Sequence, residues 1–110
     1  MITRMWRGTT RAADAETYAR YIEETGIRAY GETPGNKGAL LLTRPAGAGG
    51  DETEFLVVSF WESMDAVKKF AGPTPETAVF YPEDDRFLVD RDRTVAHYEV
   101  VSRLDAPDGT

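Results

Sequence analysis

The sequence predicts a single α+β domain whose elements follow in the order strand, helix, strand, strand, helix, strand. The chain has 110 residues, which is enough for one domain and too few for two. Four segments are rich in alternating apolar and β-branched residues, as strands are, and two segments between them carry apolar residues at helical spacing. This order predicts an antiparallel sheet with both helices on one face.

The first half of the chain provides a strand, a helix and a second strand. Residues 2–8 alternate and include Thr, Met and Trp, which favours a strand. A helix is predicted from Asp14, a suitable N-cap, to Gly26, because glycine commonly ends helices. After a turn that contains glycine and proline, residues 38–44 are predicted to form a short, strongly apolar strand.

A hairpin and the second helix follow. Residues 45–52 are rich in glycine and predict a hairpin tip; a phosphate-binding loop is excluded because its Gly-Lys-Ser/Thr pattern is missing. Residues 53–61 form the longest apolar strand and are predicted to lie inside the sheet. Ser63 is the predicted N-cap of the next helix, and Gly72 follows its last residue.

The last part of the chain is less regular. Residues 73–88 contain three prolines and are therefore predicted to form broken helical turns. A final strand is predicted over residues 93–101. The predicted fold is thus the ferredoxin-like βαββαβ arrangement with a four-stranded antiparallel sheet, over residues 1–102, followed by a flexible C-terminal tail over residues 103–110.

Both faces of the predicted sheet are apolar. In the third strand one face carries Phe55, Val57, Ser59 and Trp61, and the other carries Leu56, Val58 and Phe60. Two helices can cover only one of these faces. The other face needs an apolar cover, most simply a second copy of the chain. The sequence therefore predicts a homodimer whose sheets pack face to face.

The composition argues against several classes of function. The net charge of −6 and the scattered basic residues argue against nucleic acid as a partner. No apolar run approaches the roughly 20 residues of a membrane span, and the N-terminal segment has no signal-peptide core, so a cytoplasmic protein is expected. The chain has no cysteine and one histidine, which disfavours a metal centre. No cofactor is predicted, because a nucleotide-binding loop is also missing.

Three segments together resemble a known family. They are VVSFWESMDAVKKFAG, VFYPEDDRFL and HYEVV, and they are similar to the antibiotic-biosynthesis monooxygenases. The resemblance covers nearly the whole chain and implies a dimeric α+β barrel with a pocket between sheet and helices. It implies several possible activities, because the family includes cofactor-independent oxygenases of polycyclic phenols, haem-degrading enzymes, isomerases and ligand binders.

The haem-degrading pattern of this family pairs an Asn in the first strand with a Trp that ends the third strand and a His in the second helical region. Trp61 matches the Trp, but Arg4 and Trp6 stand near the position of the Asn, and residues 64–88 contain no histidine. The resemblance therefore favours a cofactor-independent monooxygenase acting on a small aromatic or polyketide-type substrate. The alternative is a non-catalytic barrel that binds a small apolar ligand.

His97 is the candidate catalytic residue. In a pocket of this kind a neutral imidazole can remove a phenolic or activated C–H proton near neutral pH, and the resulting anion can react with O₂ directly. The alternative is a packing role, which is common for a lone histidine in a strand. The candidate substrate-binding residues are Trp6, Trp61, Phe80, Tyr81 and Arg86.

Glu83, Asp84 and Asp85 offer three adjacent carboxyl groups. Neighbouring residues on a helical turn diverge, so the sequence predicts solvated charges here and not a metal site. Arg86 can pair with these acids or reach across a dimer interface.

Overall fold

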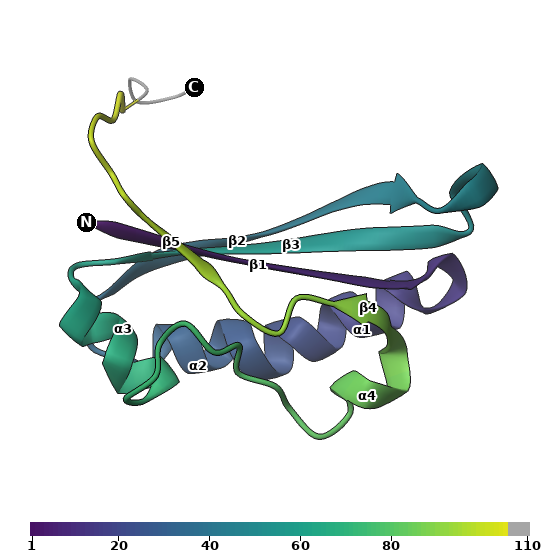
Figure 1. The fold of residues 1–110 in the computed structure, drawn as a ribbon, viewed down its shortest axis with the longest axis horizontal. Helices are drawn as coiled ribbons and strands as arrows, with labels where there is room; N and C mark the ends of the chain where they lie inside the picture. Colours follow the sequence, from purple (N-terminus) through teal and green to yellow (C-terminus); the bar gives the residue numbers. More distant parts are fainter. Residues whose placement is uncertain (106–110) are drawn as a thin grey trace.

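The computed structural model describes residues 1–105, which form one antiparallel sheet with helices on one of its faces (Figure 1). The strands are β1 (Ile2–Arg11), β2 (Asn36–Ala46), β3 (Glu52–Trp61), β4 (Leu88–Arg91) and β5 (Ala96–Glu99). The order across the sheet is β2-β3-β1-β4, and β5 pairs with the first residues of β1. The predicted α+β, ferredoxin-like fold is confirmed, and β3 lies inside the sheet as predicted.

The first helical segment is longer than predicted. α1 (Ala15–Ile22) continues through a π-helical turn, Glu23–Ile27, into α2 (Arg28–Gly31). The prediction that Gly26 ends the helix is wrong, because the apolar face continues beyond it and buries Tyr30 in the core. The predicted cap at Asp14 is also not formed, since this carboxyl group pairs with Arg11 and makes no capping hydrogen bond.

The second helix agrees with the prediction. α3 (Met64–Ala71) begins after Ser63, whose hydroxyl oxygen accepts a hydrogen bond from the N–H of Ala66. It ends at Gly72, whose φ of 85° lies in the left-handed region that favours glycine. A short helix, α4 (Asp84–Phe87), follows the irregular segment 73–83.

The predicted final strand is two short strands, β4 and β5. Between them residues 93–95 leave β1 and pair with the irregular segment instead. The N–H of Ala78 donates to the carbonyl of Arg93 (3.0 Å), and the N–H of Val95 donates to the carbonyl of Glu76 (2.8 Å). These hydrogen bonds hold the segment 73–83 against the chain that borders β1.

The core lies between the sheet and the helices. Its buried residues are Tyr18, Ile22, Tyr30, Phe55, Val57, Trp61, Ala66, Val67 and Phe87. In the sheet Arg4 lies opposite both Ser59 and His97, and directly paired residues share a face. Arg4 and His97 therefore belong to the face that the helices cover. Within residues 1–105, no helix has the length and apolar character needed to cross a membrane.

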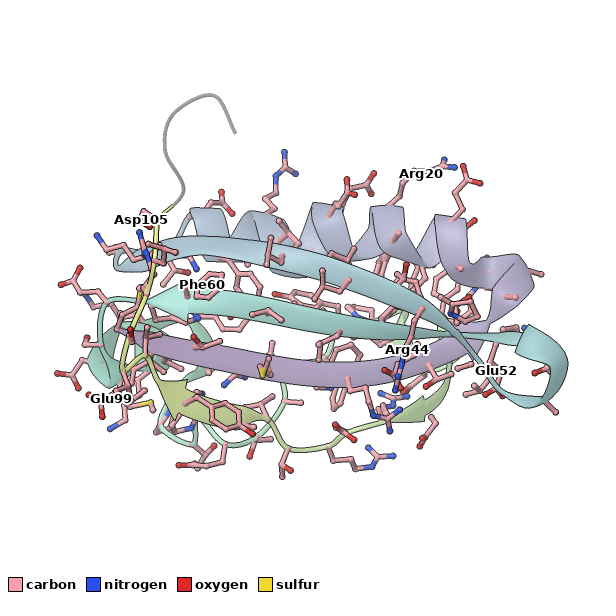
Figure 2. All side chains as sticks on the ribbon, turned by 90° about the horizontal axis from the view of Figure 1, so that it is seen from above. Arg20, Arg44, Glu52, Phe60, Glu99 and Asp105 are labelled. Atoms are coloured by element: carbon pink, nitrogen blue, oxygen red, sulfur yellow. The ribbon has the colours of Figure 1, made fainter. Side chains whose placement is uncertain are left out.

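The other face of the sheet is uncovered, and Figure 2 looks onto it. It carries Leu40 and Leu42 from β2 and Tyr98 from β5, which are 50%, 44% and 59% exposed. Phe60 and Val58 of β3 lie between these strands on the same face. Residues 100–105 leave the sheet on this side, away from the helices (Figure 1).

Candidate functional site

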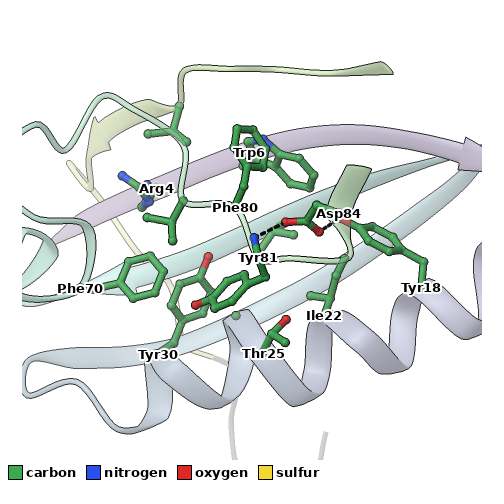
Figure 3. A pocket seen from close by; sticks show the side chains of 14 residues that line it. Arg4, Trp6, Tyr18, Ile22, Thr25, Tyr30, Phe70, Phe80, Tyr81 and Asp84 are labelled. Carbon is green, nitrogen blue, oxygen red and sulfur yellow. Dashed lines mark hydrogen bonds between the residues drawn. The ribbon is translucent and has the colours of Figure 1, made fainter. Parts of the chain in front are cut away.

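A cavity of about 50 Å³ lies between the sheet and the helices, in the position that the sequence predicted for a pocket. Its walls come from β1, α1, α2, the end of α3 and the irregular segment (Figure 3). Six of the lining side chains are aromatic: Trp6, Tyr18, Tyr30, Phe70, Phe80 and Tyr81. Sites for drug-sized ligands usually measure about 300 Å³ or more, so this cavity suits a small molecule.

Trp6 forms one wall because Gly8 leaves room for it. A Cβ atom at Gly8 would lie 2.4 Å from the Trp6 ring, so any larger residue would displace that ring. The indole N–H of Trp6 donates to the carbonyl of Asp92 (2.7 Å). The ring also meets Phe80 edge-on, with 6.1 Å between the ring centroids. These contacts fix the indole at the cavity wall.

Arg4 brings a positive charge to the same cavity. It is 3% exposed, and its guanidinium donates hydrogen bonds to the carbonyls of Pro75 and Thr77. Both carbonyls belong to the irregular segment. Burial lowers the pKa of Arg4, while Tyr30 and Glu76 act in the opposite direction. An arginine stays charged near neutral pH in any case, so Arg4 is a buried cation.

His97 reaches the cavity only through Arg4. Its Nε2 lies 3.0 Å from Nη1 of Arg4. A guanidinium can only donate, so Nε2 is the acceptor and the ring is neutral with its proton on Nδ1. Burial lowers the pKa of His97, the neighbouring Arg4 lowers it further, and Glu76 opposes both effects. The imidazole is therefore neutral, and its lone pair is already engaged.

Two phenols face the same space. Tyr30 rises from α2 and Tyr81 comes from the irregular segment (Figure 3). Burial raises the pKa of both phenols; for Tyr30 the charge of Arg4 and the Ser59 hydroxyl act in the opposite direction without reversing the shift. Both side chains therefore stay protonated near neutral pH. They can donate hydrogen bonds to a ligand, but they are poor proton acceptors.

The prediction that the three adjacent acids are solvated is wrong for Asp84. This residue is 5% exposed, and its carboxyl group accepts hydrogen bonds from the Tyr18 hydroxyl (2.8 Å) and the Tyr81 N–H (2.6 Å). The reason is that the first turn of α4 points this one side chain at α1. Asp84 thereby ties the irregular segment to α1. Glu83 and Asp85 are exposed, as predicted.

The structure brings together some of the predicted site residues. Trp6, Phe80 and Tyr81 line the cavity. Trp61 lies in the core, is 0% exposed and donates its indole N–H to the Ser59 hydroxyl (2.8 Å). Arg86 lies on the surface, where it pairs with Glu83 at 2.9 Å. Neither Trp61 nor Arg86 belongs to the cavity lining.

Sequence reasoning missed six polar or aromatic lining residues: Arg4, Tyr18, Thr25, Tyr30, Phe70 and Asp84. A signal was available for Arg4, because it stands two residues before Trp6 in a strand and so shares its face. Tyr30 was hidden by the predicted end of the helix at Gly26. Within residues 1–105, no three His, Cys, Asp or Glu side chains gather as a metal ion would require.

No protein-family model matches this sequence, and no curated protein matches it. Several solved structures have a similar fold. A candidate antibiotic biosynthesis monooxygenase from Bacillus cereus has a TM-score of 0.64 at 20% identity, over 96% of this chain and 97% of that one. A second candidate of the same kind, from Nitrosomonas europaea, has a TM-score of 0.61 at 10% identity, over 93% and 100% of the two chains.

A third similar structure is the haem-degrading protein MhuD of Mycobacterium tuberculosis with two haems bound in its active site. Its TM-score is 0.58 at 20% identity, over 96% of this chain and 100% of that one. These likenesses establish a common fold. The cavity described above measures about 50 Å³, which is too small for haem.

Proposed function

We propose that this chain, which has the fold of the antibiotic biosynthesis monooxygenases, is a monooxygenase-like protein that acts on a small aromatic molecule without a cofactor. The observation that carries the proposal is the aromatic cavity between sheet and helices, with a buried cation and three tyrosines on its walls. Aromatic walls stack a flat substrate and keep water from a reactive anion.

The proposed reaction needs only the substrate and O₂. Loss of a proton from an acidic phenol or activated methylene gives an electron-rich anion. That anion reduces O₂ and forms a C–O bond, and loss of water from the resulting peroxide leaves a carbonyl. One oxygen atom enters the product and the other leaves as water. The substrate supplies all four electrons and both protons, from the CH₂ group of an activated methylene or from the O–H and one ring C–H of a phenol.

His97 was predicted to be the base, and that role stays a prediction. The Nε2 lone pair of His97 accepts a hydrogen bond from Arg4. This hydrogen bond must break before Nε2 can take a proton from a substrate. A proton on His97 would also stand beside a buried guanidinium, which is unfavourable. A role in holding Arg4 at the cavity agrees better with this contact.

The narrow cavity supports a second candidate, a non-catalytic barrel that binds a small apolar ligand. Oxygen uptake distinguishes the two. We expect the purified protein to consume O₂ with at least one member of a panel of anthrone-like and phenolic substrates, and to insert one oxygen atom into the product per O₂. Binding without O₂ uptake above the protein-free rate across the panel would favour the non-catalytic barrel.

Two matched valine variants control for spontaneous oxidation of the substrate. Val79 lines the cavity, whereas Val89 is 49% exposed on β4. Val79→Trp is expected to fill the cavity and lower the protein-dependent rate at least about tenfold, because an overpacked site excludes the substrate. Val89→Trp adds the same ring at the surface and is expected to keep the rate. Equal rates in both variants would place the reaction outside this cavity.

We also propose that two copies of the chain pack through their uncovered sheet faces. Leu40, Leu42 and Tyr98 expose apolar surface there, and burying it gives the main favourable free energy of association. A groove of about 550 Å³ at one end of this face is lined by Met1, Thr3, Lys37, Phe60, Val100 and Arg103. Residues 100–105 leave the sheet on the same side, and the exposed Val101 and Leu104 belong to this segment, which a partner can cover.

The assembly is tested by Leu40→Glu. The wild type is expected to sediment at twice the 12.2 kDa of one chain at micromolar concentration. Each Leu40 buried in a two-fold interface contributes about 1.5–3 kcal/mol and is present twice, so the variant is expected to dissociate roughly 10²- to 10⁴-fold more readily. Thr17→Glu adds the same charge on the exposed surface of α1 and should leave the mass unchanged. A monomeric wild type would contradict the proposal.

A further inference from the structure

Within residues 1–105, Arg4 is a buried cation that forms no ion pair, although the charge of Glu76 lies near enough to raise its pKa. No ion pair formed within residues 1–105 involves Arg4; the arginines in those pairs are Arg7, Arg11, Arg20, Arg44, Arg86, Arg91 and Arg103. All three of its hydrogen-bond acceptors are neutral: two carbonyl oxygens and the imidazole nitrogen of His97. Burying an unpaired charge is unfavourable and lowers the stability of the fold. An anion that enters the cavity and pairs with Arg4 would therefore be stabilised by this charge.

The guanidinium of Arg4 has more N–H donors than hydrogen-bond acceptors around it within residues 1–105. It carries five N–H groups, and the structure within residues 1–105 provides acceptors for three of them, two at Nη1 and one at Nη2. The three acceptors hold the planar group in place from two sides, the irregular segment and β5. Phe70 also lies near it, with 5.8 Å between the guanidinium carbon and the ring centroid. Arg4 is thus a fixed fork at the cavity wall and not a mobile surface side chain.

Tyr30 can complete an anion site at the same place. Its ring rises from α2 on the side of the cavity opposite β1 (Figure 3), and its hydroxyl stays protonated, so it can donate a hydrogen bond. Among residues 1–105, Asp84 is the one carboxylate in the cavity lining, and its oxygens accept hydrogen bonds from the Tyr18 hydroxyl and the Tyr81 N–H. The cavity therefore offers an anion one fixed positive charge and donor groups, beside aromatic walls.

We infer that the cavity selects a small aromatic anion, a single ring bearing a phenolate or carboxylate oxygen that pairs with Arg4. The ring lies among Trp6, Phe80 and Tyr81. This inference rests on the proposed function and names the substrate class of the same site. The substrate is bound as an anion, so an acidic phenol needs no strong base inside the protein. The narrow cavity agrees with one ring better than with a large polycycle.

The inference is tested by direct binding of salicylate and its neutral amide, salicylamide, in calorimetric titrations without O₂ turnover. We expect salicylate to bind at least tenfold more tightly. Arg4→Gln is expected to weaken salicylate binding roughly 10- to 100-fold, the scale of a lost hydrogen bond to a charged group, and to change salicylamide binding less than about threefold. Arg4→Lys keeps the charge but not the fork and should be intermediate.

Arg7→Gln is the matched control, because Arg7 is the next arginine of β1 and lies on the uncovered face, where it pairs with Glu54, Asp90 and Asp92. It should leave both affinities unchanged. Equal affinities of the wild type for salicylate and salicylamide would overturn the inference, and so would a preference that survives in Arg4→Gln. The wild-type comparison remains decisive if Arg4→Gln does not fold. Salicylate selectivity without O₂ uptake would sink the proposed oxygenation and leave the anion site standing.

Discussion

Replacing Trp61 by alanine is expected to lower the free energy of unfolding by about 3–5 kcal/mol. The side chain is 0% exposed and packs against Tyr30 and Phe70, with ring centroids 5.6 Å and 5.8 Å away. The change leaves a large cavity in the core and removes the hydrogen bond to the Ser59 hydroxyl. A domain of this size is stabilised by only about 5–15 kcal/mol, so the loss is a large share of the total.

Urea unfolding with linear extrapolation measures this loss. Trp6→Ala is the comparison, because Trp6 is only partly buried at the cavity wall. It should cost less stability and weaken the binding of aromatic ligands more. The sequence named both tryptophans as substrate contacts, and the two variants separate a core residue from a wall residue. A Trp61→Ala variant that unfolds like the wild type but binds no ligand would return Trp61 to the site.

The fold was predictable because its signals are local. Alternation along residues 53–61 identified an interior strand, and Ser63 with Gly72 gave the bounds of α3. The one large error in the helices, at Gly26, arose because glycine is a weak helix breaker when the apolar face continues past it. The packing of Tyr30 in the core determines the length of that helix. A rule based on neighbouring residues in the sequence does not take such packing into account.

The aromatic part of the site was also predictable, but its charge was not. Trp6, Phe80 and Tyr81 were expected in the pocket and line the cavity. Arg4 was passed over because an arginine in a strand usually faces water. Its burial depends on two carbonyls of the irregular segment, more than 70 residues away in the chain. No periodicity in the sequence indicates such a contact.

The same contact changes what His97 is expected to do. The segment 93–95 pairs with residues 76–78, and this pairing brings Pro75 and Thr77 to Arg4 on one side while β5 brings His97 to it on the other. The resemblance implied that His97 lies in the pocket, and its pairing with Arg4 puts it on the face of the sheet that the helices cover. The partner of its lone pair, however, is set by the cross-strand register between β1 and β5, which the sequence does not reveal.

His97→Ala is expected to lower turnover of an acidic aromatic substrate by about 10²-fold, because the guanidinium of Arg4 then loses one of its three anchors and a small misplacement at a reacting centre has an effect of this size. His97→Gln is expected to keep most of the activity. Its side-chain oxygen can accept the hydrogen bond from Arg4, although it cannot take up a proton near neutral pH. Salicylate binding should follow the same order, with a weaker affinity in His97→Ala and a nearly unchanged affinity in His97→Gln.

The pH profile gives an independent readout of the same role. The pKa of His97 is lowered by burial and by Arg4, so the wild-type ring stays neutral to a lower pH than an ordinary imidazole. Once the pH falls below that lowered pKa, two neighbouring cations repel each other and turnover should fall; His97→Gln has no such group and should lack this acid limb. If both variants lose about 10²- to 10⁴-fold, the usual effect of removing an acid–base group, His97 is the general base after all. If neither loses activity, His97 has a packing role, and Arg4 holds its position through the carbonyls of Pro75 and Thr77 alone.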